Sequence, residues 1–146
     1  MKLEGDIMLE LHIPDFDLAQ DFYSSLGFEV VWRREPKNDK GGYMVMKKDH
    51  SIINFFGGDE GVSNHSFFTR FPKDTPRGYG VEVMIPINGI EEFYEEFLKT
   101  HKDKVIKELN HKFTMPDFRA TDPFGFYLRF VERYDWVNGR DKEGNR

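Results

Sequence analysis

Residues 7–23 read IMLELHIPDFDLAQDFY, and residues 81–94 read VEVMIPINGIEEFY. Each stretch begins with apolar residues in alternation, the pattern of a strand with one buried face. Each then turns into an acidic segment that contains Phe-Tyr. Phe93 follows Phe22 by 71 residues, close to half of the 146-residue chain. A repeat of this length indicates that the fold consists of two similar units.

Both acidic segments carry helix signals. Asp15 or Asp17 can cap the first segment, Gly27 can end it in the left-handed conformation, and Asn88 can cap the second. Apolar residues recur every three or four positions, namely Leu18, Phe22 and Leu26 in the first segment and Ile90, Phe93 and Phe97 in the second. We therefore expect one amphipathic helix in each half.

Three strand-like runs follow each expected helix. They span residues 28–33, 43–48 and 51–56 in the first half, and 105–109, 113–121 and 126–132 in the second. Asp122-Pro123-Phe124-Gly125 joins the last two runs, with Pro and Gly at the positions that a tight turn favours. Each half therefore reads β-α-β-β-β, which predicts an α+β fold.

The expected layout is one domain, residues 1–146, made of two modules. The first module covers about 5–56, a linker 57–80, the second module 81–133 and a polar tail 134–146. The linker is rich in Gly, Ser and Pro, but it also contains Phe67, Phe68 and Phe71. It is too apolar for a simple spacer, so it either folds over something or packs on the outside.

Composition narrows the class of protein. Hydrophobic residues make up 38% of the chain, enough for a core, and the absence of cysteine excludes disulfides, thiolate zinc sites and thiol nucleophiles. No apolar run is long enough to span a membrane, and residues 1–6 do not resemble a secretory signal. We therefore expect a cytoplasmic protein without a membrane partner. The net charge is −5 and the Lys and Arg residues are dispersed, so we expect no nucleic-acid partner.

Strand alternation also defines a second sheet face, opposite the helices. It is expected to carry Met8, Glu10, His12, Asn54, Phe56, Glu82, Met84, Tyr127 and Arg129. Trp32 is a further candidate for stacking on a flat ligand, and Arg119 is a candidate lining residue. Aromatic residues mixed with a few charges favour a ligand pocket, and the alternative is an ordinary solvated face.

The stretch 11–15, followed by Phe22-Tyr23 and Leu26-Gly27-Phe28, resembles the opening of the vicinal-oxygen-chelate superfamily. That group includes glyoxalase I, extradiol dioxygenases and bleomycin-resistance proteins. Residues 122–128 resemble its terminal hairpin, so the resemblance covers about 7–132. It implies two βαβββ modules whose curled mixed sheets form a cleft, usually in a homodimer.

Metalloenzymes of that superfamily hold an ion with His, Gln or Glu on the first, fourth, fifth and eighth strands. The resemblance places these positions at Met8, Asn54, Glu82 and Arg129, of which only Glu82 is a good ligand. Arg129 stays protonated, and one positive charge about 4 Å from a divalent ion costs about 8 kcal/mol at an effective dielectric of about 20. We therefore expect neither a metal nor another cofactor.

At positions where the chain differs from the metalloenzymes, it resembles the bleomycin-resistance proteins. Their last strand is similar at Leu128-Arg129, and their fourth at Phe55-Phe56. The leading hypothesis is therefore a metal-independent protein, more binder than enzyme, that sequesters a small molecule as a homodimer. The resemblance implies a ligand with cationic or aromatic groups. Glu82 then either receives a cationic group or pairs internally with Arg129.

Two alternatives remain open at this point. The first is a metal-dependent lyase, isomerase or dioxygenase of the glyoxalase type, with a shifted site that uses His12, Glu10 and Glu82. The second is a structural or interaction module whose cleft is filled by its own side chains.

Overall fold

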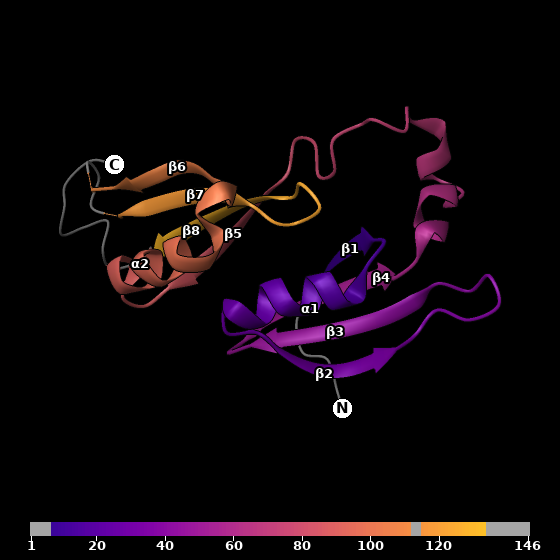
Figure 1. Ribbon diagram of the computed structural model, residues 1–146, viewed down its shortest axis with the longest axis horizontal. Helices are drawn as coiled ribbons and strands as arrows, with labels where there is room; N and C mark the ends of the chain where they lie inside the picture. Colours follow the sequence, from indigo (N-terminus) through magenta and orange to yellow (C-terminus); the bar gives the residue numbers. More distant parts are fainter. Residues whose placement is uncertain (1–6, 112–114, 134–146) are drawn as a thin grey trace. The chain divides into compact units, whose positions relative to one another are not determined.

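The computed structural model describes residues 7–111 and 115–133. The chain divides into two compact units, Met1–Thr75 and Pro76–Arg146. Each unit contains one helix and a four-stranded mixed sheet, and the helix lies along one face of the sheet (Figure 1). The α+β class and the two βαβββ modules predicted from the repeat are therefore confirmed.

Unit 1 has the strand order β1-β4-β3-β2. Its elements are β1 (Leu9–Ile13), α1 (Phe16–Ser25), β2 (Glu29–Arg34), β3 (Gly42–Lys48), β4 (Ser51–Gly57) and the 3-10 helices η1 (Glu60–Asn64) and η2 (Phe68–Arg70). Strands β1 and β4 are parallel and the other neighbours are antiparallel. The parallel pair places β1, the strand that starts the repeat, at the edge of the sheet, next to β4, the last strand of the module.

Unit 2 repeats this arrangement as β5-β8-β7-β6, with β5 and β8 parallel. Its elements are β5 (Glu82–Ile87), α2 (Ile90–His101), η3 (Lys102–Lys104), β6 (Val105–Asn110), β7 (Asp117–Thr121) and β8 (Tyr127–Glu132). The predicted run 113–121 begins later, at Asp117, and residues 112–114 lie outside the described residues. The Asp122 turn forms as predicted, because its buried carboxylate accepts the N–H groups of Phe124 and Phe126, both at 2.9 Å.

Helix α1 begins where the sequence predicted. The carboxylate of Asp15 accepts the N–H of Leu18 at 2.9 Å, so Asp15 rather than Asp17 is the cap. The buried side of the helix consists of Phe16, Ala19, Phe22 and Tyr23, followed by Leu26. Leu18 was wrongly assigned to this side. It is 45% exposed, because the buried stripe is centred on Ala19, Tyr23 and Leu26, and Leu18 lies about 100° around the helix from Ala19.

Helix α2 is capped from a distance. Its N-cap residue is Gly89, at φ +74°, and the carboxylate of Glu132 accepts the N–H groups of Gly89 at 3.1 Å and Ile90 at 2.7 Å. The prediction that Asn88 caps this helix was wrong, because Asn88 precedes the N-cap by one residue. A carboxylate at the positive end of a helix dipole is stabilising. Glu132 thereby ties the end of β8 to the start of α2.

The core of each unit lies between its helix and its sheet. In unit 1 the largest buried side chains are Ile13, Phe16, Tyr23, Met44, Met46 and Phe55, and in unit 2 they are Ile90, Phe118, Leu128 and Phe130. The rings of Phe118 and Phe130 stack at 4.7 Å between centroids. Ile7 and Val81 were expected to point inward but are 94% and 51% exposed, since both precede the first residue of their strands.

The linker does not act as a simple spacer. Its first part belongs to unit 1, where the N–H of Gly58 donates to the carbonyl of Ile13 at 2.8 Å and Val62 is buried. Helices η1 and η2 follow β4 directly. The sequence left open whether the linker folds over something or packs on the outside, and residues 58–70 fold over unit 1.

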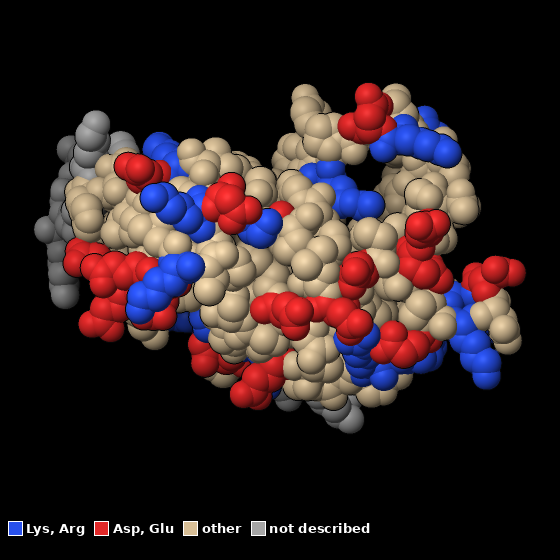
Figure 2. Space-filling view, viewed as in Figure 1, with Lys and Arg blue, Asp and Glu red and all other residues tan. Residues whose placement is uncertain are grey.

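Two surface properties bear on function. None of the described helices is long and apolar enough to cross a membrane. On the face drawn in Figure 2, acidic and basic side chains are interspersed. The described residues on that face therefore do not form the continuous basic surface that tracks a nucleic-acid backbone.

The long-range cap of α2 gives a stability prediction. We expect Glu132→Ala to lower the free energy of unfolding by about 1 kcal/mol, because two N–H groups at the helix start lose their acceptor. The measurement is urea unfolding followed by circular dichroism. Asn88→Ala is the matched control and should change stability by less than about 0.5 kcal/mol. The reverse order of the two effects would show that Asn88 is the cap.

Candidate ligand-binding site

Five polar side chains gather on the open face of the unit 2 sheet. They are Glu82 from β5, Asp117 and Arg119 from β7, and Tyr127 and Arg129 from β8. Strand register explains the gathering, since Glu82 pairs with Tyr127 and Arg119 pairs with Arg129. The intervening Leu128 and Phe130 point into the core.

The strongest contact in this group joins Arg129 to Asp117. Nε of Arg129 donates to Oδ2 of Asp117 at 2.6 Å, and the Asp117 side chain is only 8% exposed. A carboxylate this buried needs a partner of opposite charge. Asp117 was not among the predicted site residues, although its place in the predicted run 113–121 would have put it on the same face as Arg119.

Glu82 lies between two guanidinium groups. Its Oε1 is 3.8 Å from a terminal nitrogen of Arg129, and its Oε2 is 3.4 Å from one of Arg119. The predicted pairing of Glu82 with Arg129 is therefore present, with Arg119 added. Arg119 also donates to the hydroxyl of Tyr127 at 2.7 Å. That hydrogen bond raises the pKa of Arg119 above its ordinary value. Burial acts in the opposite direction, and the nearby carboxylates add to the increase.

A second polar group lies on the open face of the unit 1 sheet. Glu10 accepts from the hydroxyl of Tyr43 at 2.6 Å, and its other oxygen lies 3.0 Å from Nε2 of His12. Burial, and then the bond to Glu10, raise the pKa of Tyr43 to about 12. Asn54 pairs with Glu10 across the strands and is 2% exposed, and its Oδ1 has no hydrogen-bond partner among the described residues.

Aromatic rings surround His12. Phe56 and Phe68 each lie 4.9 Å from its ring centroid, and His65 lies at 5.0 Å. Phe68 and His65 come from the linker, so residues 58–70 cover this end of the face. Trp32 stands apart, half-exposed and 6.2 Å from Tyr43 between centroids.

The predicted residues thus fall into two groups. Unit 1 brings together Glu10, His12, Asn54 and Phe56, with Trp32 at the side, and unit 2 brings together Glu82, Arg119, Tyr127 and Arg129, with the exposed Met84 next to Arg129. Sequence reasoning missed Tyr43, Asp117, His65 and Phe68. Alternation could have found Tyr43, since it pairs with Phe56 in the register. Nothing local in the linker indicated His65.

Comparison with known proteins places this geometry in a family. Residues 8–130 match the model of the Glyoxalase/Bleomycin resistance protein/Dioxygenase superfamily. The chain belongs to this superfamily. No curated protein matches the sequence closely enough to add a specific role to this membership.

Several solved structures share the fold at low sequence identity. A hypothetical protein, SA1046 from S. aureus, is 16% identical with a TM-score of 0.65, covering 90% of this chain and 96% of that one. A glyoxalase family protein from Enterococcus faecalis is 17% identical with a TM-score of 0.62, covering 90% and 100%. A bleomycin-binding protein complexed with bleomycin is 18% identical with a TM-score of 0.56, covering 90% and 100%. Identities this low show the fold alone.

The residues of unit 2 do not fit the divalent ion of the superfamily's metalloenzymes. Glu82 is the best donor available there, and two permanently charged guanidinium groups lie within 4 Å of its oxygens. Among the described residues, no three His, Asp or Glu side chains are arranged to hold a metal. An ion bound by Glu82 would have to displace both arginines.

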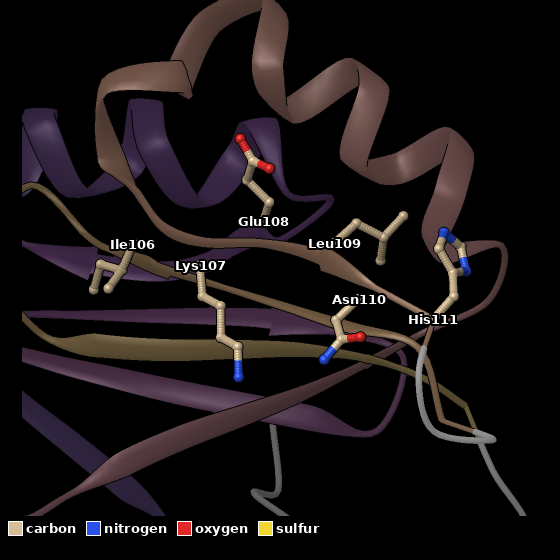
Figure 3. A pocket seen from close by; sticks show the side chains of 6 residues that line it. All are labelled: Ile106, Lys107, Glu108, Leu109, Asn110 and His111. Atoms are coloured by element: carbon tan, nitrogen blue, oxygen red, sulfur yellow. The ribbon is translucent and has the colours of Figure 1, made fainter.

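One further depression lies on unit 2, along the edge strand β6. Its lining consists of residues 106–111, whose side chains are labelled in Figure 3. All six come from one continuous segment, so groups from different elements do not converge there. The two polar groups on the open sheet faces remain the better candidates for a ligand site.

The unit 1 group gives a titration prediction. Tyr43 should ionise at a pH near 12 rather than near its ordinary 10.0, and Glu10→Gln should lower this pKa while burial keeps it above 10.0. Because the pKa is raised in the folded state, the stabilising effect is complete below pH 10 and is lost as the pH rises through 12. NMR of tyrosine labelled with ¹³C at the ring carbon that bears the hydroxyl, with Tyr43→Phe for assignment, measures this. An unchanged pKa of Tyr43 in Glu10→Gln would show that Glu10 does not contribute to the shift.

The unit 2 group gives a stability prediction. Arg129→Met should destabilise the protein by about 3 kcal/mol, because it leaves the buried Asp117 without its hydrogen-bonded partner. Arg119→Met should cost only about 1 kcal/mol, because its contacts with the carboxylates are longer. Urea unfolding of the two variants tests this order, and equal costs would contradict the ranking of the contacts.

Proposed function

We propose that this superfamily member binds a small organic molecule without a metal ion and acts by sequestering it. The observation that carries the proposal is the contact of Glu82 with Arg119 and Arg129, at 3.4 and 3.8 Å. Arg129 stands at a position where the resemblance expects a metal ligand, and Arg119 contacts Glu82, which is at another. Binding in the absence of metal chemistry is then the simplest use of a polar open face.

The open faces offer what a ligand site needs. On unit 1, Trp32 and Phe56 supply aromatic surface, and on unit 2 Tyr127 supplies it and Met84 adds an exposed, adaptable side chain. Sequestration needs affinity only, so no general base or nucleophile is required. The bleomycin-binding protein with the same fold is a precedent for binding of this kind, and bleomycin is therefore one reasonable probe.

Homodimer formation is part of the same proposal. It follows from the family resemblance, and sedimentation velocity of the purified protein measures it directly. A dimer that persists at low micromolar concentration is the expected result.

The alternative of a metal-dependent enzyme requires Glu10, His12 and Glu82 as ligands. Glu10 and His12 do lie together, at 3.0 Å, which is the observation in its favour. Glu10 already accepts from Tyr43, however, and Glu82 faces two arginines. The contacts of these side chains therefore favour the binding protein.

Metal removal separates the two functions. We expect substoichiometric metal in the purified protein by elemental mass spectrometry, and no gain in thermal stability with zinc, nickel, manganese or iron(II), because a tightly bound ion must stabilise the fold by mass action. In a thermal-shift screen of aromatic natural products that includes bleomycin, at least one compound should raise the melting temperature saturably, equally with and without a chelator. Stoichiometric metal, or binding that the chelator abolishes, would favour the enzyme.

A further inference from the structure

The two guanidinium groups of unit 2 have more N–H donors than the protein uses. Each arginine offers five donors. Arg119 donates a hydrogen bond to Tyr127, and Arg129 donates one to Asp117. Their other contacts with carboxylates, at 3.4 to 3.8 Å, are ion pairs beyond ordinary hydrogen-bond length. Most of the donors are therefore available.

One of these donors is inaccessible to solvent. Nε of Arg119 is buried and has no hydrogen-bond partner among the described residues. A buried donor without an acceptor is unfavourable, so the protein leaves the guanidinium group of Arg119 incompletely satisfied. The rest of the site is within reach, because the Arg119 and Arg129 side chains are 26% and 22% exposed.

Because Glu82 and Asp117 balance the charges of the two arginines, the unused N–H donors rather than net charge indicate the class of ligand. Two oxygens of a carboxylate or of a phosphate match the donor fork of a guanidinium group and form shorter, stronger hydrogen bonds with it than a neutral acceptor does. A cationic group, which the family resemblance implied, would approach Glu82 only alongside two positive charges. Tyr127 completes the surface, with the guanidinium carbon of Arg119 5.8 Å from its ring centre.

We propose that Arg119 and Arg129 bind an anionic oxygen group of the ligand, a carboxylate or a phosphate, next to an aromatic part that contacts Tyr127. This inference rests on the proposed function and names the chemical class of its ligand. The guanidinium pair then supplies the positive charge that a metal ion supplies in the metalloenzymes.

Three small probes with one ring test it, namely benzoate, phenyl phosphate and benzylammonium. Titrations are followed through the arginine Nε–H signals in ¹H–¹⁵N spectra, with assignments from the variants. We expect both anions, at millimolar concentration, to shift the signals of Arg119 and Arg129, and benzylammonium to leave them in place. The tighter of the two anions identifies carboxylate or phosphate as the preferred group.

Arg119→Met should weaken anion binding at least about tenfold, the effect of one charge-assisted hydrogen bond. Arg34→Met is the matched control, since it removes the same charge from unit 1 and should leave binding unchanged. If Arg119→Met does not fold, Arg119→Lys serves instead, because it keeps the charge but loses the fork and should also weaken binding.

Three results would overturn the inference. They are no shift with either anion, equal anion affinity in Arg119→Met and the parent protein, and a shift of the two arginine signals by benzylammonium. The proposed function fails separately. Stoichiometric metal, or ligand binding that a chelator abolishes, would refute it, and none of the three results above does so.

Discussion

The ion pair between Arg129 and the buried carboxylate of Asp117 determines the chemistry of unit 2. Asp117 is 8% exposed and Nε of Arg129 lies 2.6 Å from it, so neither charge can be withdrawn without leaving the other uncompensated. This contact holds one guanidinium group on the open face. Glu82 contacts that group, and Arg119 contacts Glu82. The proposals of metal-independent binding and of an anion site both follow from this one ion pair.

The repeat gives two units of one topology with opposite chemistry on their open faces. Unit 1 presents a carboxylate that links an imidazole and a phenol, through Glu10, His12 and Tyr43. Unit 2 presents two guanidinium groups held by carboxylates. The cores of both units are aromatic and alike, because the fold requires a helix packed on a mixed sheet. The open faces carry no such requirement and are therefore where the two halves differ.

Much of the fold could be predicted from sequence because its signals are local. Alternation, the Asp15 cap and the Asp122 turn each act within a few residues. The cap of α2 could not be predicted, since Glu132 lies 42 residues from the N–H of Ile90. The open-face residues were predicted as a set, but their grouping depended on strand register. Alternation could have placed Tyr43 and Asp117 on the open faces, but their hydrogen-bond partners lie on other strands and cannot be seen in one segment.

The central claim is that guanidinium groups occupy the metal position of unit 2, and manganese titration tests it most directly. Paramagnetic Mn²⁺ broadens amide signals near its binding site, so the backbone amides of Glu82, Arg119 and Arg129 report on that position. We predict that these three signals keep their intensity relative to the other assigned amides as Mn²⁺ is added. Selective broadening of all three at stoichiometric Mn²⁺ would show an ion at Glu82 and contradict the account.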